Sequence, residues 1–403
     1  MSAKSKIDYL LNIINSSSKS SSVNTSELFT NESDMVSSLS NPESSWNPHE
    51  STIIDNTRYT SITTELQEDT ETAVLDQLAN VPELKFNKSA HLKYTIKALK
   101  KSLPAAYISL DANHTWMVYW LYNSYVMLTD DPFDKDLFPL IVNKVEECLI
   151  DNGRGGIAGG SNQLGHVASS YSGILTLVIT KQYELLDQIR FNFYEWLMKL
   201  KLPNGSFMMH EDGESDTRST YCVLVIANLL NIATDELLEG VEDWIDLCQT
   251  YEGGFSNIPN TEAHGGYTFC AVASYFLLHS KIPGKDSNKF GFSLDFLTRW
   301  CVQRQHELEG GFDGRTNKLV DACYSFWVGA LFPMVELLAG TSQSLFDREG
   351  LRHYILRVAQ EETGGFRDKP GKGIDFYHTN YTLSGLSIVE HYSSDIRNSN
   401  RVC

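Results

Sequence analysis

The sequence predicts an all-α fold, namely an α/α barrel in which repeated helix pairs form two concentric rings. Three observations lead to this prediction. A glycine-containing turn recurs at intervals of roughly 50 residues, an amphipathic stretch precedes each turn, and an apolar stretch with few charges follows it. One helix pair cannot bury its apolar faces alone, so successive pairs stack side by side and share a continuous core.

The turns are recognised by one or two glycines followed closely by an apolar residue. These apolar residues are at positions 157, 207, 255, 312 and 366, so they are 50, 48, 57 and 54 residues apart. The five turns are Gly155-Gly156-Ile157, Asn204-Gly205-Ser206-Phe207, Gly253-Gly254-Phe255, Gly310-Gly311-Phe312 and Gly364-Gly365-Phe366.

The stretch before each turn is expected to form the outer, half-exposed helix of its pair. Trp244, Cys248 and Tyr251 are spaced i, i+4, i+7, which places them on one helix face. A similar stretch at 354–358 precedes the last turn. The glycines are expected to end these outer helices, because glycine adopts the left-handed conformation at little cost.

The stretch after each turn is expected to form the inner helix, buried on nearly all sides. No strand is expected. Inner helices that all begin on the same side of a barrel bring their N-termini to one mouth, where their dipoles favour an anionic ligand. The expected inner helices are Tyr221–Ile232, Thr268–Leu278, Tyr324–Phe332 and Thr379–Val389.

The bulk properties narrow the class of protein. The 33 basic and 51 acidic residues give a net charge of −18, which disfavours nucleic-acid binding. No apolar run reaches the roughly 20 residues that span a bilayer, and the first residues do not resemble a secretory signal. We therefore expect a cytoplasmic protein without membrane insertion. Residues 1–58, rich in Ser and Asn, are expected to be a largely disordered tail, and residues 59–403 the barrel.

The seven cysteines are scattered and form no CxxC pair, which argues against a disulfide framework. Cys323 differs from the others in its neighbours, because Asp321 lies two residues before it and His378 lies at the equivalent place of the next repeat. A carboxylate, a thiolate and an imidazole would supply three zinc ligands and leave a fourth position open, as in catalytic zinc sites. Taken singly, a buried cysteine and a hydrogen-bonded histidine are the simpler interpretation; the repeat placement favours the metal.

Polar groups gather before the same inner helices. Arg315 and Lys318 precede one of them, where two cations are unfavourable to the helix dipole unless an anion binds there; a solvated basic turn is the alternative. His264 precedes the previous inner helix and could donate to a diphosphate. Three further pairs lie on this or earlier helices: Tyr267 with Cys270, Arg218 with Tyr221, and Trp116 with Trp120. The spacing of the two tryptophans indicates core packing by default.

Several long motifs together resemble the protein prenyltransferase β subunits, and specifically those of protein farnesyltransferase. They are Leu319-Val320-Asp321-Ala322-Cys323-Tyr324-Ser325-Phe326-Trp327, the stretch 262–270, the stretch 368–379 and Leu383-Ser384-Gly385-Leu386-Ser387. They occur in order and with compatible spacing over residues 60 to 395. The resemblance implies a prenyltransferase-type toroid that transfers a farnesyl group from farnesyl diphosphate to the cysteine thiol of a C-terminal CaaX motif.

The resemblance also assigns the site residues. It implies that Asp321, Cys323 and His378 bind Zn²⁺, that Asp368 is a weaker Mg²⁺ ligand, and that Lys318 and Tyr324 join the zinc ligands in catalysis. The diphosphate-binding residues are then His264, Arg315, Lys318 and Tyr324. The isoprenoid-binding residues are Arg218, Tyr221, Gly266, Tyr267, Cys270 and Trp327, and the peptide-binding residues are Trp116, Trp120, Tyr377 and Tyr381.

The resemblance further implies a heterodimer with a helical-repeat α subunit. Trp116, Tyr381 and Asp368 stand where the family distinguishes farnesyl from geranylgeranyl transfer, and all three indicate farnesyl. Family members also continue through a closing C-terminal helix, which this chain is expected to lack.

Rival functions remain at this stage. A geranylgeranyltransferase type I β subunit is the nearest. A terpene cyclase also uses a helical barrel, and Asp130-Asp131-Pro132-Phe133-Asp134 has the DDxxD pattern, which we interpret as a solvated acidic turn. A binding module without catalysis would explain the repeats but not the aligned polar residues. One tightly bound zinc per chain would favour the transferase over a cyclase.

Overall fold

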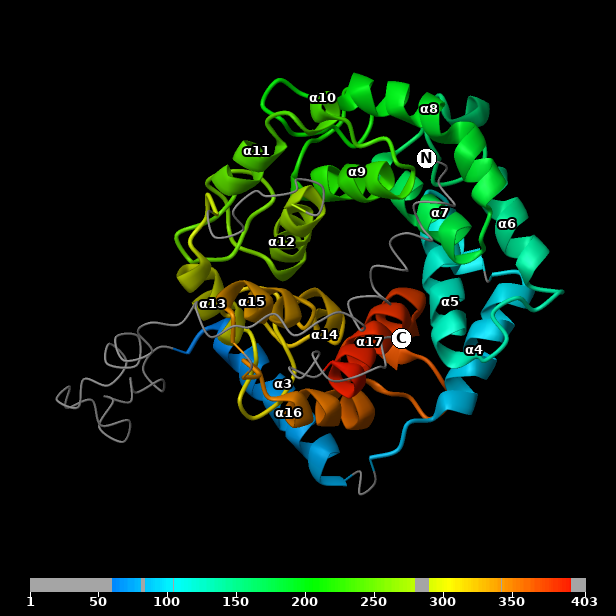
Figure 1. The fold of residues 1–403 in the computed structure, drawn as a ribbon. Coiled ribbons are helices and arrows are strands. Elements are labelled where there is room, and N and C mark those ends of the chain that lie inside the picture. Colours follow the sequence, from blue (N-terminus) through cyan, green and yellow to red (C-terminus); the bar gives the residue numbers. More distant parts are fainter. Residues whose placement is uncertain (1–59, 81–83, 104, 280–289, 342, 393–403) are drawn as a thin grey trace, which may run out of the picture.

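The computed structural model describes residues 60–80, 84–103, 105–279, 290–341 and 343–392. Its helices form two concentric rings (Figure 1), which confirms the predicted all-α barrel of helix pairs. The predicted N-terminal tail, 1–58, lies outside the described residues.

The inner ring consists of the helices that follow the turns, together with one earlier helix. Each packs against the next, and the last, α17, packs against the first, α5, which closes the ring within the described residues (Figure 1). In order they are α5 (His114–Leu128), α7 (Val167–Ile179), α9 (Thr217–Leu229), α12 (Gly265–His279), α14 (Tyr324–Trp327) with α15 (Leu331–Ala339), and α17 (Phe376–His391).

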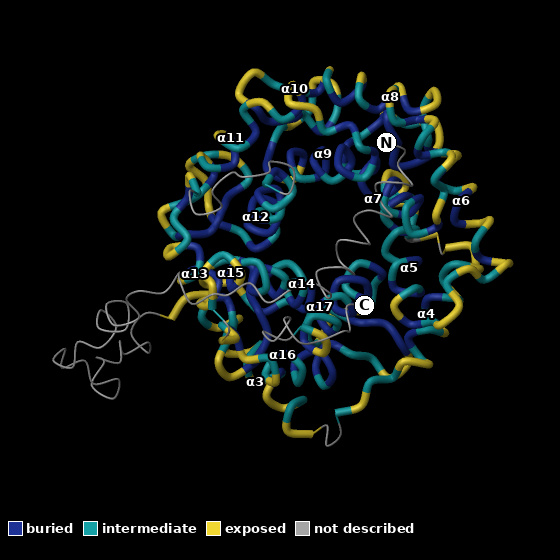
Figure 2. The backbone as a smooth tube through the Cα atoms, viewed as in Figure 1, coloured by how far each residue is buried: buried dark blue, intermediate teal, exposed yellow. Residues whose placement is uncertain are grey.

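The outer ring carries most of the exposed residues, whereas the layer between the rings is buried (Figure 2). Short 3₁₀ helices, η3 (Ala105–Leu110) and η4 (Asp151–Gly153), lie in the connections. The outer helices are α4 (Lys88–Lys100), α6 (Phe138–Glu146), α8 (Tyr183–Leu200), α10 (Asp235–Leu238), α11 (Val241–Leu247), α13 (Leu294–Val302), and α16 (Arg348–His353) continuing into the π-helical η5 (Tyr354–Ala359), with α3 (Ile62–Asn80) beside η5.

The glycines do not end the outer helices, so this prediction was wrong. Helix α11 ends at Leu247, and Tyr251, 94% exposed, already lies in the reverse turn that follows. Gly253 has a φ of 107°, and a Cβ there would come within 2.1 Å of the Phe296 carbonyl oxygen. A Cβ on Gly254 would come within 2.6 Å of the Trp300 ring. The glycines are therefore needed because α13, the next outer helix, packs directly on the turn.

A hydroxyl residue lies 13 positions after the apolar residue of each turn, and in three of the five repeats it ties the turn to its inner helix. The backbone N–H of Phe255 donates to Thr268 Oγ1 over 2.9 Å, and Ile157 and Phe366 donate in the same way to Ser170 and Thr379. The five apolar residues themselves are fully buried: Ile157, Phe207, Phe255, Phe312 and Phe366. The repeat read from the sequence is thus a repeat of core positions.

The inner helices begin at one end of the barrel, as predicted. At the starts of α5, α7, α9, α12 and α14, a backbone N–H is hydrogen-bonded to the loop of the next repeat. Gly265 N–H donates to the Gly314 carbonyl over 2.8 Å, and Ala322 N–H donates to the Asp368 carbonyl over 3.0 Å. Equivalent bonds join His114 to Gly159, Val167 to Met209 and Thr217 to Asn257. These bonds align the first turns of neighbouring inner helices around one mouth.

One predicted inner helix, Tyr324–Phe332, is interrupted. Helix α14 ends at Trp327 and α15 begins at Leu331. Pro333 has no N–H to donate to the carbonyl four residues earlier, and Gly329 N–H donates to Tyr324 five residues back. The proline therefore accounts for the break.

The N-terminal helices complete the outer ring between the last repeat and the first. His91 of α4 is fully buried; its Nδ1 accepts from Gly365 N–H over 2.9 Å, and its Nε2 lies 2.9 Å from Gln360 Oε1. Arg357 of η5 donates to the Leu78 carbonyl at the end of α3 over 3.0 Å. The last turn is thereby joined to residues almost 300 positions earlier in the chain.

One short hairpin departs from the expectation of no strands. Strand β1 (Phe366–Arg367) pairs antiparallel with β2 (Ile374–Asp375). The hairpin lies at the mouth and leads directly into α17.

Candidate functional site

Asp321, Cys323 and His378 come together at the mouth, although they belong to two repeats. One potential ligand atom from each lies within 4.8 Å of the others. His378 Nε2 is 3.1 Å from Asp321 Oδ1, and the same oxygen accepts from Cys323 N–H over 2.8 Å. Cys323 is 3% exposed. A carboxylate, a thiol and an imidazole converging on one point form a donor set suited to Zn²⁺.

A fourth residue orients His378. Asp375 caps the N-terminus of α17: its Oδ1 accepts from His378 N–H over 2.7 Å, and its Oδ2 lies 2.6 Å from His378 Nδ1. Strand β2 ends at Asp375, so the hairpin fixes this carboxylate. A carboxylate on one imidazole nitrogen leaves the other nitrogen facing the metal position, which is the usual arrangement around histidine ligands.

The protonation states of the triad depend on one another. Burial raises the pKa of the Cys323 thiol well above its usual value, and the charge of Asp321 adds to this effect. Burial alone would lower the pKa of His378, but hydrogen bonds to Asp321 and Asp375 outweigh it and raise the pKa to about 10. A metal ion must displace the protons of both groups, so its binding releases protons.

Counting from the turns shows that the site lies in the first turns of the inner helices. The residue nine positions after each apolar turn residue is at 166, 216, 264, 321 or 375. Asp375 is therefore the equivalent of Asp321, whereas His378 is the equivalent of Tyr324. The expectation that His378 lies at the position equivalent to the other two ligands was therefore wrong. Its side chain nevertheless reaches Asp321 from the next repeat.

The residues predicted to bind diphosphate partly converge beside the triad. His264 Nε2 is 3.0 Å from Tyr324 Oη, and His264 Nδ1 accepts from Gly266 N–H over 3.0 Å. Arg315 Nη1 pairs with Glu262 over 3.0 Å. Burial and the charge of Arg315 lower the pKa of His264 to about 4, so its imidazole is neutral at pH 7. Lys318 is exposed and lines a separate hollow with Glu262.

A cavity of about 690 Å³ lies next to these groups, and seven of its 22 lining residues are Trp or Tyr, so we call it the aromatic cavity. Trp116 and Trp120 of α5 face it, with ring centroids 5.6 Å apart, and Trp120 lies 5.4 Å from the Tyr377 ring. The predicted isoprenoid and peptide residues thus share one cavity. The predicted residues that line it are Trp116, Trp120, Arg218, Tyr221, Cys270, Trp327, Tyr377 and Tyr381.

Comparison with known proteins shows the family to which this chain belongs. Residues 86–403 match the family described as prenyltransferase alpha-alpha toroid domain. A protein farnesyltransferase subunit beta from Schizosaccharomyces pombe is 41% identical over 337 residues, which are 81% of this chain and 84% of that protein. The chain belongs to the protein farnesyltransferase β-subunit family. Another member, from Saccharomyces cerevisiae, is 43% identical over 81% of this chain and 76% of its own length.

The chain is also similar, at lower identity, to geranylgeranyl transferases and to a terpene cyclase. A geranylgeranyl transferase type-1 subunit beta from Arabidopsis thaliana is 32% identical over 77% of this chain and 86% of that protein. The structure of Candida albicans protein geranylgeranyltransferase-I aligns with a TM-score of 0.65 at 23% identity, over 76% of this chain and 92% of that chain. A type II terpene cyclase from Scytonema aligns with a TM-score of 0.52 at 11% identity, over 78% and 98%. The toroid alone therefore does not separate a farnesyltransferase from a cyclase.

The cyclase-like acidic motif lies away from the farnesyltransferase β-subunit site. Asp131 is exposed, and its carbonyl accepts from Tyr125 Oη over 2.7 Å. Asp134 accepts from the N–H groups of Asp136 and Leu137 before α6. None of these aspartates lines the aromatic cavity. The motif is an acidic turn, as the sequence indicated.

Asp368, predicted as a Mg²⁺ ligand, lies beside the triad on the next loop. Its backbone carbonyl accepts from Ala322 N–H and from Tyr354 Oη, each over 3.0 Å. Its carboxylate pairs with Lys369. Burial and then the charge of Asp321 raise the pKa of Asp368. A second cation near these two carboxylates would relieve their repulsion.

Two predicted isoprenoid residues, Gly266 and Tyr267, do not line the aromatic cavity. Tyr267 instead stacks beneath the Arg218 guanidinium, 5.8 Å from the ring centroid. A Cβ on Gly266 would lie 3.3 Å from the His264 ring. Both residues therefore lie against other predicted site residues, Arg218 and His264.

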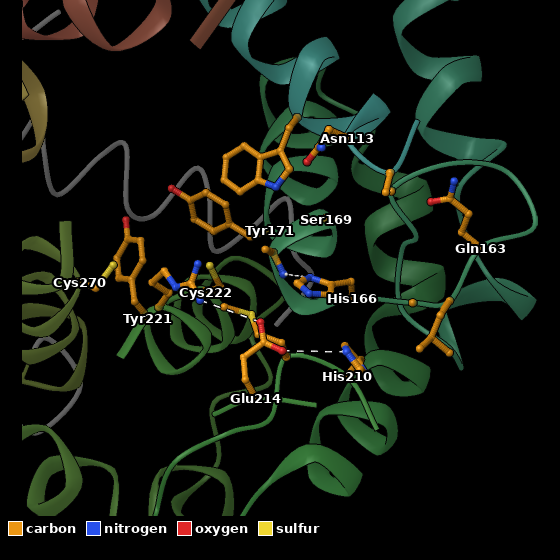
Figure 3. A pocket seen from close by; sticks show the side chains of 18 of the residues that line it. Asn113, Gln163, His166, Ser169, Tyr171, His210, Glu214, Tyr221, Cys222 and Cys270 are labelled. Atoms are coloured by element: carbon orange, nitrogen blue, oxygen red, sulfur yellow. Dashed lines mark hydrogen bonds and ion pairs between the residues drawn. The ribbon is translucent and has the colours of Figure 1, made fainter. Parts of the chain in front are cut away.

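Sequence reasoning missed one edge of the farnesyltransferase β-subunit cavity, which Figure 3 shows. His166, His210 and Glu214 form a polar group there, with the two imidazole rings 5.6 Å apart and His210 4.0 Å from Glu214 (Figure 3). The repeat held the signal, since His166 occupies the position equivalent to His264 and caps its helix in the same way, accepting from Ala168 N–H over 3.2 Å.

Two further predictions concern the cysteines and membrane-spanning helices. The six described cysteines are all free and buried, as expected for a chain without a disulfide framework. Among the described residues, no helix is long and apolar enough to cross a membrane.

Proposed function

We propose that this chain is the catalytic β subunit of a protein farnesyltransferase, which transfers the farnesyl group of farnesyl diphosphate to the cysteine thiol of a C-terminal CaaX motif. The observation that carries this proposal is the convergence of Asp321, Cys323 and His378 beside an aromatic cavity, in a chain 41% identical to a protein farnesyltransferase β subunit. The reaction forms a carbon–sulfur bond at C1 of the isoprenoid and releases diphosphate.

The triad would hold Zn²⁺, because its donors and the orienting carboxylate of Asp375 suit that ion. Zn²⁺ bound there lowers the pKa of a substrate thiol, so that a thiolate is available at neutral pH. The protein's own contribution is to fix the ligand directions and to exclude water. Cys323 is nearly fully buried, and Trp327 Nε1 donates to Tyr377 Oη over 3.0 Å at the cavity wall.

The diphosphate would bind at the first turns of α12 and α14. Tyr324 would donate its hydroxyl there. The neutral His264 accepts at Nδ1, so its single N–H is on Nε2 and would hold Tyr324 Oη in place, while Arg315 would offer charge. Donors already held in place before the reaction stabilise the charge that develops on a leaving group. Lys318 would join them by turning inward from its exposed position. Asp368 would help to hold Mg²⁺, which would offset negative charge on the leaving group.

The aromatic cavity would hold the farnesyl chain and the aliphatic residues of the peptide side by side. Trp116 and Tyr381 would limit the isoprenoid to fifteen carbons. Arg218, Tyr221, Cys270 and Trp327 would line the isoprenoid side, and Trp120 and Tyr377 the peptide side. Burial of such chains against aromatic walls favours binding by roughly 25 cal/mol per Å² of apolar surface.

The assembly would be a heterodimer in the cytoplasm. The α subunit would complete the diphosphate and peptide sites, so we expect this chain alone to be inactive. The acidic residue balance, with a net charge of −18, would suit basic protein substrates rather than nucleic acid.

Co-expression with a cognate α subunit tests the proposal. The purified heterodimer is assayed for prenyl transfer to a CaaX peptide with farnesyl and geranylgeranyl diphosphate in parallel. We expect transfer that depends on the α subunit and a higher kcat/KM for farnesyl diphosphate. A preference for geranylgeranyl diphosphate would instead identify a type I geranylgeranyltransferase, and cyclised isoprenoid products without peptide would identify a cyclase.

A further inference from the structure

A buried network of four charged residues lies in the turn before α14. Arg304 Nη1 is 3.0 Å from Asp313 Oδ1, and His306 Nε2 is 3.1 Å from Asp313 Oδ2. His306 Nδ1 is 2.7 Å from Glu309 Oε2. Arg304, Glu309 and Asp313 are 3%, 1% and 4% exposed. Burial lowers the pKa of His306, but hydrogen bonds to both carboxylates outweigh it and raise the pKa to about 9, so His306 is protonated at neutral pH beside the Arg304 guanidinium.

The turn itself does not require these charges. The positions equivalent to Asp313 in the first two repeats are Ala158 and Met208, which follow the same kind of turn. Buried ion pairs are often no more stabilising than apolar residues of the same size, because each ion loses its hydration. Neither the turn nor the stability of the fold therefore explains the buried charges, so we consider the residues that contact them.

The network supports the loop that carries Arg315 and Lys318. Asp313 forms an antiparallel bridge with Val320, and Asp321 N–H donates to the Phe312 carbonyl over 3.0 Å. These contacts form the base of the loop 314–319. Asp313 is thus the point at which the buried cations are joined to the loop that precedes the metal triad.

Helix α3 reaches the same network from the N-terminal side. Gln67 Nε2 donates to Glu309 Oε2 over 3.2 Å, while Glu309 Oε1 is buried and has no hydrogen-bond partner. Gln67, His306, Asp313 and Lys318 line one hollow of about 1120 Å³. Helix α3 lies on the outer side of the barrel (Figure 1), packed against η5, which continues α16. The network therefore joins an N-terminal helix to the loop at the mouth.

We propose that Arg304, His306, Glu309 and Asp313 are positioning residues that hold the backbone of the loop 314–319, from which Arg315 and Lys318 reach the diphosphate, with Gln67 of α3 as part of that support. This inference rests on the proposed function, because it takes the ligand of Arg315 and Lys318 to be an isoprenoid diphosphate. The network touches neither substrate nor metal. Its effect is on how well the loop cations are placed before the diphosphate arrives.

The expected signature is a change in diphosphate binding with little change in chemistry. Neutralising Asp313 leaves Arg304 and His306 without their shared carboxylate, so the base of the loop loses its anchor. The cations would then have to be ordered on binding, which weakens the ground-state complex. Zinc ligation should survive, because Asp321 keeps its bonds to Cys323 and His378.

Three variants of the heterodimer test this: Asp313→Asn, His306→Gln and Gln67→Ala. For each we measure zinc content, the Kd for farnesyl diphosphate by equilibrium titration, and kcat and KM for both substrates. We expect Asp313→Asn to raise the Kd and KM for farnesyl diphosphate by about tenfold, equivalent to about 1.4 kcal/mol. The KM for the peptide and the zinc content should stay unchanged. His306→Gln and Gln67→Ala should have smaller effects in the same direction.

Glu242→Gln is the matched control. Glu242 also joins a histidine and a second partly buried group, since its Oε1 accepts from Tyr275 Oη over 3.0 Å and lies 3.6 Å from His279 Nε2. These residues lie near the C-terminal end of α12, away from the mouth. The control should lower thermal stability without changing the Kd for farnesyl diphosphate.

A second comparison uses the loop cation itself. If the network acts through Lys318, the effect of Asp313→Asn should shrink when Lys318 is already Ala, so the two changes should not be additive. Additive effects would argue against the inference, as would a wild-type Kd in Asp313→Asn or an equal rise in Glu242→Gln. Should Asp313→Asn fail to fold, unchanged Kd values in both His306→Gln and Gln67→Ala would overturn the inference. Absence of prenyl transfer in the wild-type heterodimer would instead contradict the proposed function, and the titration distinguishes the two cases.

Discussion

The first turns of α9 and α14 begin with the same residue type at equivalent positions and use it differently. Asp216 caps α9 and pairs with Arg218 of the same turn over 2.6 Å. Asp321 accepts from Cys323 N–H in the same way, but its carboxylate also reaches His378 of the next repeat. The local ion pair satisfies Asp216, whereas Asp321 is left with a partner that a metal ion can replace.

This difference teaches how a repeated scaffold gains a reactive site. Both of these repeats supply an aspartate at the start of an inner helix, and the residues on the neighbouring turns decide its role. A cation two residues later, as at Arg218, pairs with the aspartate and leaves it unable to bind a metal. A thiol two residues later, with a histidine from the next repeat, instead gives the aspartate two partners that can bind the same metal ion. The predictions below test whether the two aspartates differ as described.

The largest effect is expected from Asp321→Asn. The amide removes a negatively charged ligand and leaves His378 Nε2 without its carboxylate partner, so we expect loss of bound zinc and of prenyl transfer. Metal analysis and a peptide assay on the heterodimer check this. Full turnover with one zinc per heterodimer would remove Asp321 from the ligand set.

The next largest effect is expected from Asp375→Asn, because Asp375 holds His378 Nδ1 at 2.6 Å. Loss of an orienting carboxylate typically costs about 10- to 100-fold in metal affinity or activity. Zinc affinity is measured by competition with a chelator at fixed pH. An affinity equal to that of the wild type would show that β2 places His378 without help from this carboxylate.

Substitution of Trp116 should change selectivity more than rate. Trp116→Thr removes an indole from the cavity wall beside Tyr171 and Trp120, whose rings each lie 5.6 Å away. We expect the ratio of kcat/KM for geranylgeranyl to farnesyl diphosphate to rise by at least about tenfold, since extra apolar length is then accommodated. An unchanged ratio would place the end of the isoprenoid elsewhere in the cavity.

The smallest effect is expected from Asp216→Asn, the counterpart of Asp321→Asn. The amide keeps part of the helix cap and loses the ion pair with Arg218, so the free energy of unfolding should fall by about 1 kcal/mol. Zinc content should not change. If this variant also loses zinc, the two aspartates are not independent and the comparison fails.

Much of the fold could be predicted from the sequence because its signal is periodic. The glycine-containing turns and the buried residues at 157, 207, 255, 312 and 366 follow one repeat, and the inner helices follow from it. The role of the glycines could not be predicted in the same way. Gly254 is needed because the Trp300 ring lies against it, and a contact between successive repeats leaves no local pattern.

The candidate site was predictable to a similar degree. Resemblance supplied the residues, and the repeat supplied the helix starts that hold them. Counting nine positions from each turn would also have found His166 at the cavity edge and Asp375 behind His378. The outward placement of Lys318 could not be read in this way, because the direction of a loop side chain depends on contacts such as the bridge at Asp313.

Zinc content and prenyl transfer of a Cys323→Ala heterodimer test the central claim most directly. Cys323 is the ligand that distinguishes α14 from α9, and its alanine variant leaves the cavity and the Asp321–His378 pair in place. We predict loss of zinc and of transfer to the CaaX peptide, while the Kd for farnesyl diphosphate stays within about twofold of the wild type. Wild-type turnover in this variant would contradict the account.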